Sequence, residues 1–175
     1  MWNNALRNIR VLTVVTFLLV LATGILSISS IRKVNENLYW ALHTKDVLQL
    51  SDELYASLLE SESNLRGYSL SMDQSFITEY SQSKTFSLKL LDSLKNLTND
   101  NKQQHDDLIT LKKDIEERVK LLDSILAMVR VYRVEFDQRI SDKVIQGKKI
   151  TQKIKVELQN INQREYILLQ GRNKG

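Results

Sequence analysis

Residues 11–31 form a run of 21 residues without a charged side chain, rich in valine, leucine and isoleucine. As an α-helix with a rise of 1.5 Å per residue, this run would be about 31 Å long, close to the thickness of a bilayer's hydrocarbon core. It therefore predicts a helix that crosses a membrane once. The alternative is a cleaved signal peptide, because Ala22, Gly24, Ser27 and Ser29 could provide a cleavage site. The apolar core of a signal peptide is usually shorter, about 7 to 15 residues.

Basic residues flank this run on both sides. Arg7 and Arg10 precede it, Arg32 and Lys33 follow it, and the terminal amine adds a charge to the first side. The positive-inside rule slightly favours a cytoplasmic N-terminus. We expect a single-pass protein of the cell (inner) membrane with a cytoplasmic N-terminus, a transmembrane helix and an extracytoplasmic domain at residues 1–10, 11–31 and 32–175, respectively.

The composition favours helices throughout the rest of the chain. There is no proline and there are five glycines among 175 residues, whereas strands joined by tight turns need more of both. The absence of cysteine excludes disulfides and thiolate metal sites. The net charge of +4 comes from interspersed residues of both signs, so the clustered basic face of a nucleic-acid-binding protein is missing and no such partner is expected.

Apolar residues recur every three or four positions in four successive stripes, a spacing that predicts amphipathic helices. The first stripe runs from Val47 to Leu65 and is expected to continue the membrane helix. Asp73 is placed to cap a second helix that ends near Leu97. The polar segment 98–101 then predicts a turn, after which Asn101 and Gln104 resemble a capping box.

The third stripe begins at Leu108 and the fourth at Ile150. A single helix over both would extend about 100 Å, whereas the second helix would cover only about 37 Å of it. Each buried leucine or isoleucine contributes about 1.5 to 3 kcal/mol, so the chain should fold back. The segment from Ser141 to Gly147 is the predicted reversal, and the predicted fold is an all-α, elongated up-down-up-down four-helix bundle behind the transmembrane helix.

Residues with catalytic or metal-binding potential are sparse. His43 and His105 have no second ligand-type residue at metal spacing, and they are expected to be exposed helix residues. Paired carboxylates are explained by solvated helix faces, and there is no glycine-rich phosphate loop. Tyr132, Arg133 and Phe136 could line a ligand pocket, although such a stripe is more often core. We assign no catalytic, cofactor-binding or metal-binding residue.

One segment is unusual. Two leucines and an acidic residue precede Glu62, then Arg66-Gly67-Tyr68, then a short turn with Asp73 and the aromatic Phe76. This pattern resembles the third subtype of CHASE domain over about residues 38–170. The resemblance implies an extracytoplasmic helical sensory module of a bacterial histidine kinase, diguanylate cyclase or chemotaxis receptor. Members of that family usually have a glycine in the turn, where this chain has Met72.

The resemblance also implies partners. Related receptors act as homodimers and continue into a second membrane helix and a cytoplasmic signalling effector, which this sequence does not contain, so it is either a fragment or an orphan sensory subunit. We predict a non-enzymatic sensory input domain that relays an unknown cue through its transmembrane helix. The alternative is a single-pass helical tether or oligomerisation module, and an enzyme is the weakest hypothesis.

The Arg66 corner is predicted to be a structural motif. Glu62 and Arg66 are spaced for an ion pair on one helix, but an exposed pair of this kind contributes only about 0.3 to 0.5 kcal/mol. We therefore expect Arg66 to bond carbonyl oxygens where the first helix ends. Gly67 should allow a neighbouring backbone to approach, and Tyr68 should pack beneath the corner.

Overall fold

The computed structural model describes the backbone of residues 2–99, 101–132 and 138–173. This part of the chain contains four α-helices and no strand: α1 (Trp2–Ser71), α2 (Ser75–Leu97), α3 (Lys102–Tyr132) and α4 (Gln138–Asn173). Two compact units can be separated, Met1–Leu42 and His43–Gly175. The all-α prediction is confirmed.

The first unit consists of the first part of α1. Its apolar side chains between Val11 and Ile31 are exposed, and the helix is long and apolar enough to cross a membrane, with a mean hydropathy of 2.6 over its best window. Thr16 Oγ1 donates a 2.9 Å hydrogen bond to the Leu12 carbonyl, and Thr23 Oγ1 donates one of 2.9 Å to the Val20 carbonyl. These hydroxyls are therefore satisfied within their own helix, as an apolar solvent requires.

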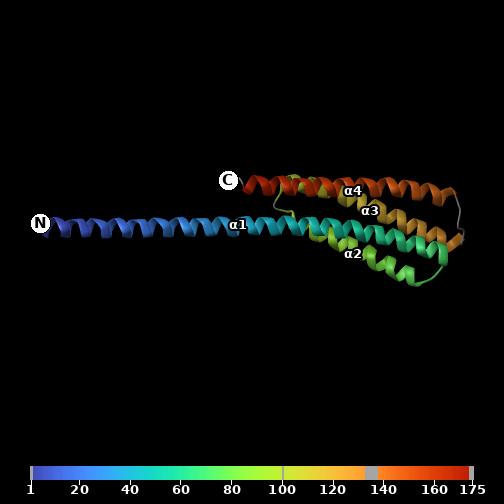
Figure 1. Ribbon diagram of the computed structural model, residues 1–175. Helices are drawn as coiled ribbons and strands as arrows, with labels where there is room; N and C mark the ends of the chain where they lie inside the picture. The colour runs from blue at the N-terminus through green and yellow to red at the C-terminus, as the bar shows by residue number, and fades with distance from the viewer. Residues whose placement is uncertain (1, 100, 133–137, 174–175) are drawn as a thin grey trace. The chain divides into compact units, whose positions relative to one another are not determined.

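The second unit is a bundle of the remainder of α1 with α2, α3 and α4 (Figure 1). Consecutive helices run antiparallel (Figure 1), and for α3 and α4 the contacts show it directly, because residues later in α3 contact residues earlier in α4. On α3, the successive residues Asp107, Asp114 and Arg118 contact α4 at Arg164, Lys153 and Thr151. The predicted up-down-up-down order is thus present.

The predicted apolar stripes form the core of this unit. Each helix contributes one face, because residues three or four apart lie on the same side of a helix. Side chains at most 1% exposed include Val47, Leu54, Leu94, Leu111, Ile115, Leu122, Ile154 and Ile161.

The predicted reversal from Ser141 to Gly147 is wrong. These residues lie inside α4, which begins at Gln138, so the connection falls between Tyr132 and Gln138. Gly147 is buried within the helix, and a Cβ added there would lie 2.5 Å from Nη1 of Arg118. The glycine that suggested a turn instead makes room for a side chain of the neighbouring helix.

Asp73 was predicted to cap the second helix, but the N-cap of α2 is Gln74, whose side chain makes no capping hydrogen bond. The Asp73 carboxylate accepts a 2.9 Å hydrogen bond from the Ser75 backbone N–H, and this bond lowers the pKa of Asp73. Met72 has a φ of 55°, and its N–H donates to the Tyr68 carbonyl at 2.8 Å. This left-handed conformation closes a helix and favours glycine, the residue that the resemblance leads us to expect at this position.

Candidate functional site

Three charged side chains, two from α1 and one from α3, form one cluster. Arg118 Nη2 donates to Glu62 Oε2 at 2.7 Å, and Arg66 Nη2 donates to Glu62 Oε1 at 3.1 Å. Arg118 Nε also donates to Thr151 Oγ1 on α4 at 2.9 Å. One carboxylate thus faces two guanidinium groups, and the cluster connects three helices.

Arg118 is the buried member of this cluster. Its side chain is 4% exposed, against 24% for Glu62 and 67% for Arg66. A buried charge needs a partner, and removing one partner of such a pair costs about 3 to 5 kcal/mol. Within the described residues, Nη1 of Arg118 is buried and has no hydrogen-bond partner. The site therefore contains a buried cation with unused donor capacity.

A partly enclosed cavity of about 180 Å³ adjoins this cluster. Its polar lining comes from Glu62, Arg66, Ser69 and Arg118. The apolar lining comes from α1, α3 and α4 and consists of Leu65, Leu70, Leu122, Ile125, Ile140 and Val144. The combination of an apolar wall with a few convergent polar groups is typical of small-molecule sites.

The contacts of Arg66 and Gly67 differ from the predicted ones, and the structure also defines the position of Tyr68. Arg66 contacts the Glu62 carboxylate rather than carbonyl oxygens, because α1 continues beyond it to Ser71. The Ser71 hydroxyl instead donates to the Gly67 carbonyl at 2.8 Å. A Cβ on Gly67 would lie 2.6 Å from the ring of Phe76, so the close neighbour is an aromatic side chain rather than a backbone. Tyr68 is 5% exposed and belongs to the core.

A second polar cluster lies at the other end of the bundle. Gln104 Nε2 donates to Glu165 Oε1 at 2.6 Å, and Thr44 Oγ1 donates to Glu165 Oε2 at 3.3 Å. All three side chains are at most 2% exposed. The predicted capping box at Asn101 is wrong, because the Gln104 amide is directed to α4 and not back to the start of α3.

A pair of acidic side chains links α3 and α4 between these two clusters. Lys153 Nζ lies 2.6 Å from Asp114 Oδ2 and 3.7 Å from Glu157 Oε1. The pKa of Glu157 is raised to about 7, first because burial penalises the charged form and second because Asp114 lies beside it. The Glu157 carboxyl group is consequently about half protonated near pH 7.

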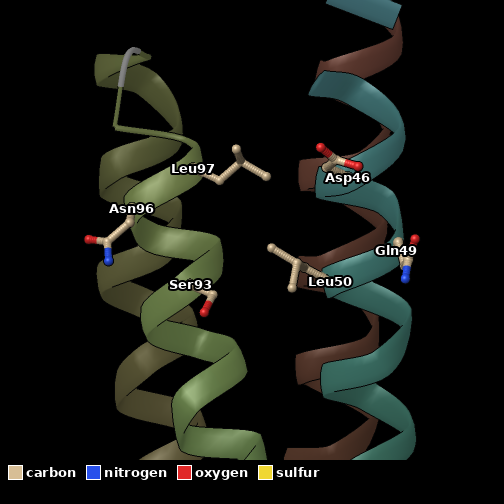
Figure 2. Close-up of a pocket in the computed structure, with 6 residues that line it drawn as sticks. All are labelled: Asp46, Gln49, Leu50, Ser93, Asn96 and Leu97. Atoms are coloured by element: carbon tan, nitrogen blue, oxygen red, sulfur yellow. The ribbon is translucent and has the colours of Figure 1, made fainter. Parts of the chain in front are cut away.

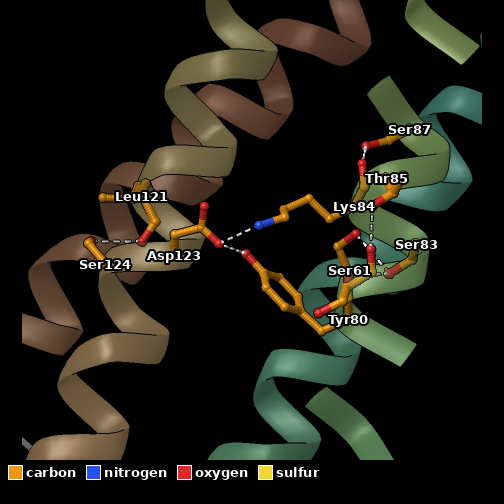
Figure 3. A network of polar contacts seen from close by, with 10 residues as sticks. Ser61, Tyr80, Ser83, Lys84, Thr85, Ser87, Leu121, Asp123 and Ser124 are labelled. Carbon is orange, nitrogen blue, oxygen red and sulfur yellow. Dashed lines mark hydrogen bonds and ion pairs between the residues drawn. The ribbon is translucent and has the colours of Figure 1, made fainter. Parts of the chain in front are cut away.

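Polar contacts also join α2 to its neighbours (Figure 3). Tyr80 donates to Asp123 Oδ1 at 2.7 Å, Lys84 Nζ lies 2.9 Å from the same oxygen, and Ser61 donates to Ser83 at 3.0 Å. Burial and the bond to Asp123 raise the pKa of Tyr80 well above its usual range. These contacts fix the position of α2 against α1 and α3.

A wider groove of about 620 Å³ lies between α1 and α2 (Figure 2). It is open to solvent, and its lining residues are Asp46, Gln49, Leu50, Ser93, Asn96 and Leu97. Asp46 is its charged residue. Because an open groove buries little of a small ligand, the partly enclosed cavity beside Arg118 is the better candidate site.

Other candidates from the sequence fall outside this site. His43 and His105 are half-buried rather than exposed. No group of three metal-ligating side chains occurs among the residues that the structure describes. The side chains of Tyr132, Arg133 and Phe136 lie outside the described residues.

Gln104, Arg118 and Glu165 are buried polar residues whose burial was not predicted from the sequence. A signal was present, since each continues an apolar stripe: Gln104 and Arg118 are spaced with Leu111, and Glu165 follows Ile161 by four positions. A polar residue at a core position of a helix indicates a buried partner.

Comparison with known proteins agrees with this architecture. The profile of the CHASE3 domain matches residues 38–175, so the chain belongs to the CHASE3 domain family. The fold is similar to the crystal structure of the sensor domain of histidine kinase HK9 from Rhodopseudomonas palustris, with a TM-score of 0.64 and 20% identity. That match covers 71% of this chain and 97% of the sensor domain. A search of curated protein sequences gave no match.

Proposed function

We propose that this chain is the extracytoplasmic sensory input domain of a bacterial signalling receptor of the histidine-kinase type, anchored by the first part of α1. The CHASE3 match over residues 38–175 carries the proposal, because domains of this family are sensory. The candidate membrane helix and the fold shared with a histidine kinase sensor domain support it. In this role the chain is not an enzyme.

The proposed mechanism is a shift between two helix arrangements. A cue changes the bundle only by binding one arrangement more tightly, and a shift from 1:99 to 99:1 needs about 10⁴-fold tighter binding. α1 contributes to the core and continues into the membrane segment, so a displacement of α1 relative to α4 would pass toward the cytoplasm. The buried cluster of Thr44, Gln104 and Glu165 is the contact such a displacement would rearrange first.

A hybrid receptor tests this relay. Residues 1–175 would be joined to the second membrane helix and kinase of a receptor with measurable autophosphorylation. Glu165→Gln removes a buried charge from the cluster and should change the basal kinase output at least severalfold, whereas Glu60→Gln, on the exposed surface, should not. If both variants give the output of the parent, the chain acts as a tether and the sensory proposal is wrong.

Membrane orientation is a separate part of the proposal. Cysteines at Asn4 and at the exposed Ser81 can be probed with an impermeant thiol reagent in intact cells. We expect labelling of Ser81→Cys alone, since the bundle is proposed to lie outside the cytoplasm. Labelling of Asn4→Cys alone would invert the topology.

We further propose that the receptor is a homodimer. Val34, Leu38 and Leu42 follow the membrane segment at intervals of four residues and are 64%, 56% and 51% exposed, respectively. Such a stripe suits a parallel two-helix contact. A strictly monomeric species of the full chain in mild detergent would contradict this.

A further inference from the structure

We propose that the cavity beside Arg118 binds a small carboxylate anion with an apolar body. This inference rests on the proposed sensory function and gives that function a ligand class. The shape of the cavity, the charge of its lining and the burial of Arg118 support it.

The first argument is the charge balance. Two guanidinium groups and one carboxylate line the cavity, so its lining carries an excess positive charge. Each oxygen of Glu62 already receives one arginine, at 2.7 Å from Arg118 and at 3.1 Å from Arg66. Glu62 balances one of the two arginine charges, and a ligand carboxylate would balance the other. It would accept hydrogen bonds from guanidinium N–H groups that do not bond Glu62. Planar guanidinium groups suit carboxylates because they can donate two parallel hydrogen bonds.

The second argument is the burial of the cation. The Arg118 side chain is 4% exposed, and water therefore reaches its donors poorly. A buried donor without a partner costs about 1 to 3 kcal/mol, more when it is charged. Arg118 lines the cavity, so an anion that enters it would lie beside this buried charge, and binding should stabilise the folded protein.

The third argument concerns the shape and polarity of the remaining wall. Leu65, Leu122 and Ile125 are at most 5% exposed and form the floor, whereas Leu70 and Val144 are 69% and 47% exposed and lie at the rim. Arg66, at 67% exposure, also lies at the rim. The volume of about 180 Å³ is below the roughly 300 to 1,000 Å³ of sites for drug-sized ligands. The occupant is therefore a small molecule with one charged end and an apolar remainder.

Calorimetric titration of the full chain in detergent micelles tests the proposal, with sodium hexanoate as the probe. Hexanamide has the same apolar body without the charge, and acetate has the charge without the body. Arg66→Gln removes the exposed arginine, and Val144→Phe narrows the cavity while keeping every charge. Arg130→Gln removes an arginine from the exposed surface of α3 outside the cavity and serves as the matched control. Circular dichroism establishes that each variant is folded.

We expect saturable binding of hexanoate to the parent and to Arg130→Gln, and at least about tenfold weaker binding to Arg66→Gln, Val144→Phe and both control compounds. So small a ligand binds weakly, so the titration extends to about 10 mM hexanoate. If the folded parent shows no saturable binding in this range, the proposal is overturned. Equal binding to the parent and Arg66→Gln also overturns it. Either result leaves the sensory function intact if Glu165→Gln still changes the output of the hybrid receptor.

Discussion

The packing of Phe76 on Gly67 leads to a prediction that opposes ordinary helix propensity. Gly67 lies inside α1, where glycine is about 1 kcal/mol less favourable than alanine. A Cβ at this position would, however, lie 2.6, 2.7 and 3.0 Å from three atoms of the Phe76 ring. Phe76 is partly buried against the core, so its ring must move as a whole. Gly67→Ala tests which effect is larger.

The magnitude follows from the two opposing terms. Overpacking of this kind costs about 1 to 3 kcal/mol, and the helix gain of about 1 kcal/mol offsets part of it. We expect Gly67→Ala to lower the free energy of unfolding by about 1 kcal/mol. In a Phe76→Ala background the obstacle is absent, and the same substitution should raise the free energy by about 1 kcal/mol. The coupling between the two positions is then about 2 kcal/mol.

Urea unfolding of the full chain in detergent, followed by circular dichroism, measures the four proteins of this cycle. Gly171→Ala is the control, because nothing lies within 4 Å of a Cβ added there. It should change the free energy of unfolding by no more than a few tenths of a kcal/mol, since it lies near the end of α4. If Gly67→Ala stabilises the protein in both backgrounds, Phe76 does not pack on Gly67 and our account of the Arg66-Gly67-Tyr68 motif is wrong.

Three further predictions concern the bundle. Tyr80→Phe removes the 2.7 Å bond to Asp123 and should lower the free energy of unfolding by about 1 kcal/mol in urea titrations, and an unchanged midpoint would contradict the bond. The raised pKa of Glu157 means that its stabilising contribution is complete below its unfolded pKa of 4.5 and is lost as pH rises through about 7. After allowance for solvent screening, the parent should therefore lose about 1 kcal/mol between pH 5 and 8 relative to Glu157→Gln, and parallel pH profiles would show that burial beside Asp114 has no such effect. Met72→Gly should raise the thermal midpoint by stabilising the protein by about 1 kcal/mol, because it removes the strain of a φ of 55°, and a lower midpoint would exclude this strain.

The positions of the helices were largely predictable from the sequence because the signals are local. The spacing of Val47, Leu54, Leu111 and Ile154 determines which face of each helix becomes apolar, and all four are fully buried. The hydrogen bond from the Ser75 N–H to Asp73 joins residues two positions apart, so a contact of Asp73 with the start of α2 was predictable, although the N-cap itself is Gln74. The uncharged run at residues 11–31 likewise marks the candidate membrane segment by length and composition alone.

The tertiary structure decided which polar residues of the stripes meet. Arg118 and Glu62 are 56 residues apart, and Gln104 and Glu165 are 61 apart, so no local pattern pairs them. Gly147 is a second feature that the local sequence did not explain. The glycine predicted a turn, whereas its lack of a side chain makes room for the Arg118 guanidinium group from α3. Helix propensity and periodicity depend on neighbours in the chain, whereas burial of a charge and the space it needs depend on residues brought together only by folding.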